Sequence, residues 1–344
     1  MARLLPVASL VGHSEERVWH VDWSPSGLSI ASCGTDKTIR IWSRAAPPHA
    51  HAADGWSCQA VLEEGHQRTI RCVCWAPDGR FIASCSFDGT ASVWECVDAE
   101  FDCVASLEGH ENEVKAVSWN AAGSLLATCG RDKAVFIWEA EDENFEVAAV
   151  MHSHSQDVKC VTWHPTEDVL ASCSYDDTIK LYSRSMGDDD WRCSSTLSGH
   201  TSTVCDDCSV VLWEAKEGQY VEAARVPEVH ERAIYSVSWT GDSSAGLVAT
   251  GAADDGISIF KARSAAMPAL QHIPTARLSS PDGPAALCKE STRDSAHQGD
   301  VNCVAWRPQP RGENNSLGCL LASAGDDGTV RIWSCEQPED MRLD

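Results

Sequence analysis

Histidine, serine and aspartate recur in this sequence at spacings that could support nucleophilic chemistry. His66, Ser84 and Asp88 make one such set, and a histidine beside a hydroxyl and a carboxylate can activate that hydroxyl for attack on an electrophile. Comparable sets begin at His110 and His154, and the three histidines lie 44 residues apart. An enzyme needs one nucleophile, whereas a set repeated at constant spacing is typical of a structural element. We therefore predict that the protein has no catalytic residue and is not an enzyme.

The elements that carry these sets are short strands. Four further copies begin at His13, His200, His230 and His297, so repeats account for nearly the whole chain. In the third copy, residues 114–119 alternate apolar and polar side chains, as a half-buried strand does. Turn residues separate this stretch from three more predicted strands, which are Leu125–Cys129, Ala134–Trp138 and Phe145–Val150.

Four antiparallel strands make the blade of a propeller, and a period of 44 residues resembles the WD40 repeat. The sequence therefore predicts an all-β, seven-bladed WD40 β-propeller that occupies residues 1–344 as a single domain. Residues 5–10 belong to no blade, and we expect them to close the ring as the outer strand of the last blade. The blades are expected near residues 13–62, 66–107, 110–151, 154–197, 200–226, 230–296 and 297–333.

The resemblance to the WD40 family also implies a role for the recurring residues. In that family the closing aromatic residue bonds a Ser or Thr, which bonds the histidine, which bonds the aspartate. A buried polar network of this kind specifies one arrangement of the strands when every member is satisfied. The structural tetrads are expected at His66, Ser84, Asp88 and Trp94; at His110, Thr128, Asp132 and Trp138; and at His154, Ser172 and Asp176.

The fifth copy departs from the pattern. Asp207 follows His200 by 7 residues, where the regular copies have 22, and the missing stretch covers most of the first two strands. We expect a truncated fifth blade, with its third strand at Ser209–Trp213 and its outer strand at Tyr220–Ala224. We interpret the gap as an error of the gene model or of splicing; the alternative is a ring that lacks these strands.

Seventeen cysteines, an odd number, in a chain without a secretory signal favour a reducing compartment. Cys205 and Cys208 form a CxxC pair, but it straddles the shortened stretch and no second pair stands at ligand spacing. We predict no metal site and no cofactor, and expect ten cysteines to pack as small apolar residues at repeated positions. They are Cys33, Cys85, Cys129 and Cys173; Cys72, Cys160 and Cys303; and Cys58, Cys103 and Cys193.

A narrower resemblance rests on the motifs that lead and close the blades. Leu107–Lys115 reads LEGHENEVK, His154–Lys159 reads HSQDVK, and Asp300–Trp306 reads DVNCVAW. With Gly65–Thr69 (GHQRT) and Ser174–Thr178 (SYDDT), they resemble the WD40 subunit of the cytosolic iron–sulfur protein assembly (CIA) targeting complex. The resemblance covers nearly the full length and is densest in blades two to four.

This resemblance implies a scaffold of the cytosol and nucleus that helps deliver iron–sulfur clusters. The implied partners are a DUF59-domain adaptor protein, a HEAT-repeat scaffold, and apo client proteins such as DNA polymerases, helicases and primase. One motif departs from the family. Family members often have Leu-Tyr-Arg or Leu-Tyr-Lys at the end of blade four, a motif linked to a co-chaperone contact, whereas this chain has Leu181–Arg184 reading LYSR.

A ubiquitin-ligase receptor and an enzyme are the two alternative functions. A substrate receptor of a ubiquitin ligase is the first alternative, but such receptors often carry Trp-Asp-x-Arg after the third strand of a blade, and no Trp-Asp dipeptide occurs here. An enzyme is the second, and no phosphate-binding loop, zinc-protease helix or other unrepeated catalytic motif supports it. Fold alone does not choose among scaffolds.

Charge and hydropathy exclude some partners. A net charge of −24 argues against direct binding to nucleic acid, which needs a dense Lys/Arg surface. No apolar run approaches the length of a membrane span, and the first residues lack the apolar core of a signal peptide. We expect a soluble chain that binds neither nucleic acid directly nor membrane.

A local basic surface is nevertheless expected. The face of a WD40 propeller that carries the turn aspartates is its usual binding face, and two repeated positions place side chains there. Asn302 is expected among them, and the other candidates gather cations and aromatic rings, the composition of interface hot spots. We predict that this surface binds an acidic or C-terminal carboxylate-bearing segment. The candidate partner-binding residues are Arg131, Lys115, Arg71, Lys159, Trp19, Phe87, Tyr175 and Tyr235.

Overall fold

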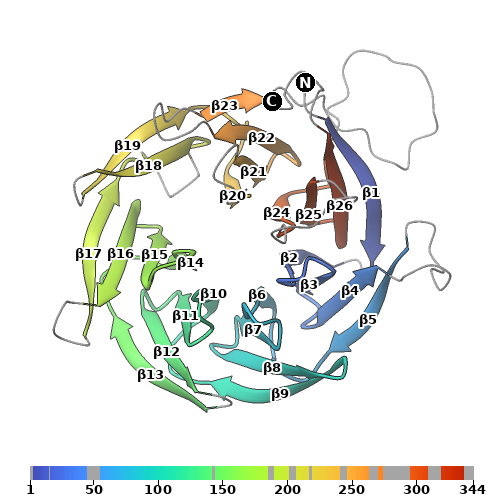
Figure 1. The fold of residues 1–344 in the computed structure, drawn as a ribbon, viewed down its shortest axis with the longest axis horizontal. Coiled ribbons are helices and arrows are strands. Elements are labelled where there is room, and N and C mark those ends of the chain that lie inside the picture. The colour runs from blue at the N-terminus through green and yellow to red at the C-terminus, as the bar shows by residue number, and fades with distance from the viewer. Residues whose placement is uncertain are drawn as a thin grey trace.

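The regular elements of this protein are β-strands arranged around a ring (Figure 1). The structure, a computed structural model, describes residues 3–14, 16–44, 55–141, 144–184, 190–200, 207–216, 219–240, 246–262, 270–273, 295–308 and 319–336. Over these ranges, no helix is long and apolar enough to cross a membrane. The all-β propeller predicted from the repeat is confirmed.

Blades one to four are antiparallel four-stranded sheets, with strands in chain order from the centre of the ring outward (Figure 1). Blade one contains β2 (Val18–Trp23), β3 (Ser29–Gly34), β4 (Ile39–Arg44) and β5 (Trp56–Leu62). Blade two contains β6 (Ile70–Trp75), β7 (Phe81–Ser86), β8 (Ala91–Val97) and β9 (Glu100–Leu107). Blade three contains β10 (Val114–Trp119), β11 (Leu125–Gly130), β12 (Val135–Glu141) and β13 (Asn144–Met151). Blade four contains β14 (Val158–Trp163), β15 (Val169–Ser174), β16 (Thr178–Arg184) and β17 (Trp191–Ser198).

The remaining described strands form two four-stranded sheets and one two-stranded sheet. The two-stranded sheet contains β18 (Val210–Lys216) and β19 (Gln219–Val226). The sixth blade contains β20 (Ile234–Trp239), β21 (Leu247–Ala252), β22 (Ile257–Ala262) and β23 (Leu270–Ile273). The last contains β24 (Val301–Trp306), β25 (Cys319–Gly325), β26 (Thr329–Glu336) and β1 (Arg3–Val11). Six complete blades are therefore present in the described chain, and the count of seven is not confirmed.

The first and last strands of the chain lie side by side. β1 pairs antiparallel with β26, from Arg3 opposite Glu336 to Val11 opposite Thr329. The first 44 residues thus contribute both the outer strand of the last blade and most of blade one (Figure 1). This is the pairing expected for residues 5–10, and it occupies an edge of β26 that would otherwise present unpaired backbone groups.

The expected chain of hydrogen bonds is present in blade three. His110 Nδ1 lies 2.7 Å from Asp132 Oδ2, and His110 Nε2 lies 2.8 Å from Thr128 Oγ1. Trp138 Nε1 donates to the same Thr128 oxygen at 3.0 Å. A neutral imidazole satisfies all three groups if Nδ1–H donates to the carboxylate and the threonine hydroxyl donates to Nε2. Burial raises the pKa of Asp132, but its hydrogen bond and electrostatic interaction with His110, together with hydrogen bonds from two backbone N–H groups, outweigh burial and hold that pKa below its ordinary value.

The network varies between blades with the closing aromatic residue. In blade two, Ser84 links His66 and Trp94 at 2.9 and 3.0 Å. In blade four the aromatic position holds Tyr182, which is fully buried and lies 3.4 Å from the Ser172 hydroxyl. His200 and Asp207 retain their hydrogen bond beside the two-stranded sheet. The His–Asp link therefore persists even where the inner strands of the blade were expected to be missing.

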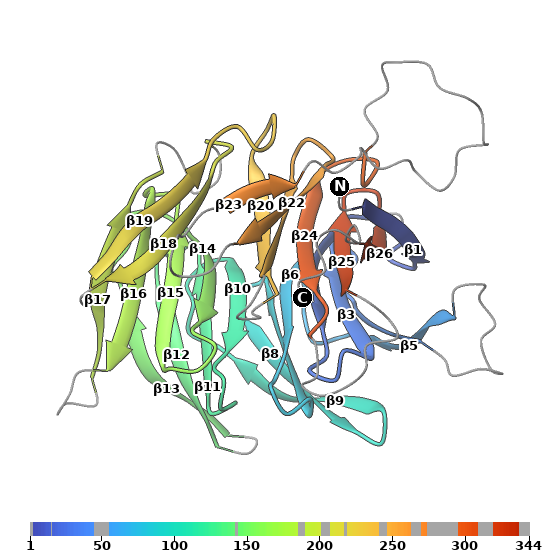
Figure 2. The same cartoon turned by 45° about the horizontal axis from the view of Figure 1, so that its top comes forward.

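The neighbours of the two-stranded sheet are less buried than their counterparts elsewhere. β18 and β19 lie at the outer rim between β17 and β23 (Figures 1 and 2). Val237 and Trp239 of β20 are 59% and 51% exposed, whereas Val117 and Trp119, at the same repeat positions of β10, are buried. β15 alternates buried and partly exposed residues, whereas β11 is buried throughout. No described strand covers these surfaces, because the chain lacks the stretch that would supply them.

We predict that Asp132→Ala lowers stability by about 1–3 kcal/mol, because it leaves His110 without its acceptor. Thermal melting and urea denaturation measure the loss. Asp102→Ala is the matched control, since Asp102 is exposed on the outer strand β9 and should be close to neutral. An unchanged melting temperature and urea midpoint in Asp132→Ala would show that this hydrogen-bond chain does not stabilise blade three.

We also predict that the purified protein binds a hydrophobic dye and self-associates, because β20 exposes contiguous apolar side chains. The double variant Val237→Thr/Trp239→Thr should reduce both properties, measured by dye fluorescence and light scattering. Val147→Thr is the control, since Val147 is exposed on the outer strand β13, away from this surface. A monomeric wild-type protein that melts cooperatively without binding dye contradicts the prediction.

Candidate functional site

The predicted surface residues of the inner strands share one backbone feature. In blade two, the pairing register between the first two strands shifts between Ile70 and Cys72. The other described four-stranded blades have the same shift at the equivalent position. The residue inside this shift is not a ladder partner of the second strand, and such bulges re-aim a side chain. The residues at this position are Trp19, Arg71, Lys115, Lys159, Tyr235 and Asn302.

Three cations and two aromatic rings lie close together at the start of β2, β6, β10 and β14 and in the turn after β15. The Arg71 guanidinium lies 4.8 Å from the centre of the Trp19 ring. Lys159 Nζ lies 3.6 Å from the centre of the Tyr175 ring, and Lys115 Nζ lies 5.6 Å from it. Cation–π attraction therefore contributes to holding these side chains in place. We name this set, Trp19, Arg71, Lys115, Lys159 and Tyr175, the inner basic cluster.

The cations of the inner basic cluster influence one another electrostatically. Burial lowers the pKa of the Lys159 ammonium, the charges of Lys115 and Arg71 lower it further, and the resulting pKa is about 8. Asp157 acts in the opposite direction and forms an ion pair with Lys115 at 2.5 Å. One carboxylate therefore compensates only part of three positive charges, and an additional anion would be favoured there.

A second group surrounds Arg131. The side chain of Arg131 is 56% exposed, and its guanidinium lies 3.2 Å from Glu113, which also binds Arg68 at 3.2 Å. The Arg68 guanidinium in turn lies 6.0 Å from the centre of the Phe87 ring. Arg131 and Phe87 each precede a turn aspartate, so the turns of blades two and three present them. Glu113 thus organises two exposed arginines that remain open to a partner on their other sides.

Sequence reasoning missed two cations of this surface. Arg68 stands two residues before the inner strand β6, and Arg17 stands one residue before β2. The Arg17 guanidinium lies 5.6 Å from the Trp19 ring and forms an ion pair with Asp326 at 3.2 Å. Both arginines could have been predicted from their position in the loop before an inner strand, because that loop lies on the same face as the turn aspartates.

Two predicted positions do not join the cluster. Asn302 was expected to be exposed, but it is buried, and its amide donates to the Val18 carbonyl and to Asp326. This prediction is wrong because the amide links the last blade to blade one. Tyr235 is 46% exposed on β20. It is separated from blade four by the place where the inner strands of the fifth blade are missing.

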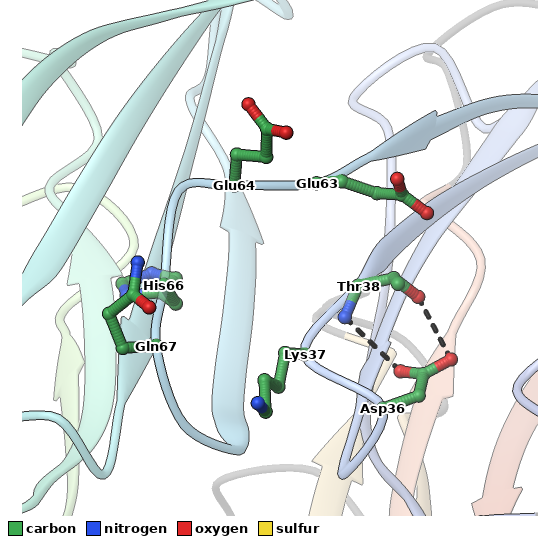
Figure 3. Close-up of a pocket in the computed structure, with 7 residues that line it drawn as sticks. All are labelled: Asp36, Lys37, Thr38, Glu63, Glu64, His66 and Gln67. Carbon is green, nitrogen blue, oxygen red and sulfur yellow. Dashed lines mark hydrogen bonds between the residues drawn. The ribbon is translucent and has the colours of Figure 1, made fainter.

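A separate pocket of about 590 Å³ lies between the turn of blade one and the loop that enters blade two (Figure 3). Its lining is polar and includes Lys37, Glu63, Glu64 and Gln67. Figure 3 also shows Asp36 bonded to Thr38 and turned away from His66, since each belongs to the hydrogen-bond network of its own blade. An apolar enclosure of the kind that binds small molecules is not formed here.

The cysteine predictions hold for part of the set. Cys33, Cys72, Cys85, Cys129 and Cys303 are buried. The expectation fails for the outer-strand cysteines, which are exposed because an outer strand has a neighbour on one side only, and for Cys160 and Cys173, which face the missing strands. The cysteines that depart from the expectation are Cys58, Cys103, Cys160, Cys173 and Cys193. In the described ranges no group of three metal-ligating side chains is arranged to hold an ion, and Cys205 lies outside those ranges.

Comparison with known proteins agrees with this architecture. A family model described as "WD domain, G-beta repeat" matches residues 4–43, 56–95, 101–139, 145–183 and 288–334. The "Probable cytosolic iron-sulfur protein assembly protein Ciao1" of Culex quinquefasciatus is 45% identical, over 98% of this chain and 100% of its own length. "Protein CIA1" of Arabidopsis thaliana is 42% identical over 96% of each chain, and the "Probable cytosolic iron-sulfur protein assembly protein 1" of Yarrowia lipolytica is 42% identical over 95% and 98%.

Proposed function

The chain belongs to the WD40-repeat family and to the cytosolic iron–sulfur protein assembly proteins within it, and on this premise we propose that it is a scaffold of that machinery. The scaffold brings partner proteins together for the delivery of iron–sulfur clusters to apo-proteins. Similarity over nearly the whole length to relatives that carry this name is the observation that supports the proposal most strongly. The proposal includes a single propeller domain with seven blade positions, of which the fifth is incomplete.

We propose that the scaffold is not catalytic. The Ser, Thr and His side chains that could act as nucleophile and base are buried in every described four-stranded blade that carries the set, and they bond one another. Ser84, for example, contacts His66 and Trp94 and is fully buried, so a substrate could not reach its hydroxyl. The same arrangement in several blades is what a structural network requires.

The face that carries the turn aspartates supports a binding role. The inner basic cluster and the Arg131 group place several cations on this face in a chain whose net charge is −24. Exposed charges farther than about 8 Å are largely screened at physiological salt, so the local positive charge governs what binds. We propose that this face receives an acidic or C-terminal carboxylate-bearing segment of a partner or client.

The partners follow from the same premise. We propose that a DUF59-domain adaptor, a HEAT-repeat scaffold and apo iron–sulfur clients bind this protein, in the cytosol and also in the nucleus. Affinity purification of the tagged chain with identification of co-purifying proteins tests this. Recovery of the DUF59 adaptor supports the proposal, and recovery of ubiquitin-ligase subunits in its place contradicts it.

We predict that Arg131→Glu weakens capture of the partner by about 2 kcal/mol, roughly a 30-fold increase in Kd, without changing the melting curve. Combining it with Lys115→Glu should weaken capture further, because both cations are replaced by repelling charges. Arg192→Glu is the matched control, since Arg192 is 58% exposed on the outer strand β17, away from this face. Unchanged binding by the Arg131→Glu/Lys115→Glu double variant would rule out this surface.

We also predict that capture of an acidic partner weakens as pH rises through about 8, because Lys159 loses its charge over that range. Binding is fully present below that pH, where the ammonium is charged, and a bound anion shifts the midpoint upward. Lys159→Arg should remove this step, since an arginine stays charged throughout. Binding titrations of both proteins with the same partner between pH 7 and 9 measure the difference; identical pH profiles contradict the prediction.

A further inference from the structure

Three pairs of cysteines stand directly opposite each other on neighbouring strands. Cys72 faces Cys85 in blade two, and Cys160 faces Cys173 at the same positions of blade four. Cys319 faces Cys335 in the last blade. Opposite residues in an antiparallel ladder have Cα atoms about 4.5–5.5 Å apart. This separation lies within the range of about 4.4–6.8 Å that a disulfide bridges, and all six thiols are reduced in the structure.

The cysteine pair in blade four is more exposed to solvent than the pair in blade two. Cys72 and Cys85 are buried, whereas Cys160 is exposed and Cys173 is partly exposed. The repeat positions are the same, so the difference comes from the neighbouring blade. Blade three covers the inner strands of blade two, but the chain lacks the strands that would cover β14 and β15 in the same way.

The cysteine pair in blade four differs from the pair in the last blade in the pKa of its thiols. The hydrogen bond between Cys160 and Cys173 lowers the pKa of the Cys160 thiol. Desolvation and the interaction with Cys72 oppose this shift, the charges of His20 and Arg71 support it, and the net pKa is lowered. Burial instead raises the pKa of Cys319 to about 12 and that of Cys335 to about 11. The pKa of Cys72 is also lowered, by Cys85, so only blade four combines a favoured thiolate with access.

We propose that Cys160 and Cys173 are a reversible redox dithiol that a peroxide oxidises to a disulfide across β14 and β15. The Cys160 thiolate attacks a peroxide oxygen, the O–O bond breaks, and the sulfur is oxidised to a sulfenic acid while water leaves after protonation. The Cys173 sulfur then attacks the sulfenic sulfur; the S–S bond forms, the S–O bond breaks and a second water leaves. In total, two thiols and one hydrogen peroxide give one disulfide and two waters.

The dithiol lies next to the inner basic cluster. Cys160 follows Lys159 directly, and Cys173 stands two residues before Tyr175. The cation–π contact between Lys159 and Tyr175 therefore links β14 to the turn that directly follows β15, next to the two strands that the disulfide would join. Formation of the disulfide fixes the spacing of the strands beneath that contact.

The test uses the 344-residue chain with Cys58, Cys103 and Cys193 replaced by serine, which removes exposed thiols on the outer strands. Limited hydrogen peroxide, alkylation of remaining thiols and peptide mass mapping should show loss of alkylation at Cys160 and Cys173 together. A linked pair of peptides two hydrogens lighter should appear, and dithiothreitol should restore both thiols. The internal controls are Cys72 with Cys85 and Cys319 with Cys335, which should remain alkylatable after unfolding.

A second variant identifies the resolving residue. Cys173→Ser should leave a sulfenic acid at Cys160 that reacts with dimedone, whereas Cys85→Ser should leave formation of the Cys160–Cys173 disulfide unchanged. The proposal is overturned if Cys160 and Cys173 stay reduced for as long as the control pairs. It is equally overturned if Cys160 links to another cysteine, such as Cys208.

Discussion

The hydrogen bond between the repeat histidine and the turn aspartate is the interaction on which the described arrangement depends. It joins the loop that enters the inner strand to the turn between the second and third strands, and it occurs in all seven copies of the repeat. The aspartate also accepts the backbone N–H of the residue after the histidine, as Glu111 donates to Asp132 in blade three. The carboxylate and the imidazole therefore satisfy groups that would otherwise be buried without partners.

The proposed binding surface is a consequence of this link. Because the turn and the entry loop are held together, the residue before each aspartate and the bulged residue of each inner strand appear on one face of the ring. In blades two to four these positions hold arginine, lysine and aromatic residues, and their mutual contacts keep the cations side by side. Burial is the main cause of the lowered pKa of Lys159, and the positive charges of Lys115 and Arg71 lower it further, so the isolated cluster also contains repulsion between its cations. An anionic partner relieves that repulsion, which is a physical reason for binding at this place rather than elsewhere on an acidic protein.

The fifth copy of the repeat is incomplete in this chain, and the structure shows what the missing stretch leaves behind. The His–Asp bond of that copy and its two outer strands are retained, and the ring remains closed at the chain ends by β1 and β26. Residues on both sides of the missing strands are less buried than their counterparts in other blades. Side chains such as Val237 and Cys160 occupy positions that are interior in other blades, but here they face outward. The alignment with the Culex quinquefasciatus relative spans 372 positions, more than the 344 residues of this chain, so that relative contains residues that this chain lacks.

The sequence predicted the features that depend on one copy of the repeat, whereas features that depend on contacts between blades required the tertiary structure. The repeat spacing, together with the resemblance to the WD40 family, identified the propeller, the members of the hydrogen-bond networks and the position after the leading apolar residue of each inner strand, because these depend on interactions within one copy of about 44 residues. Burial depends on the neighbouring blade, so the pattern could not distinguish exposed Cys160 from buried Cys72, which share one repeat position. For the same reason the pattern placed Asn302 at the surface, whereas its hydrogen bonds to Val18 and Asp326 bury it. Which cations share one carboxylate, as Arg68 and Arg131 share Glu113, was likewise decided only when separate copies of the repeat were brought together in the ring.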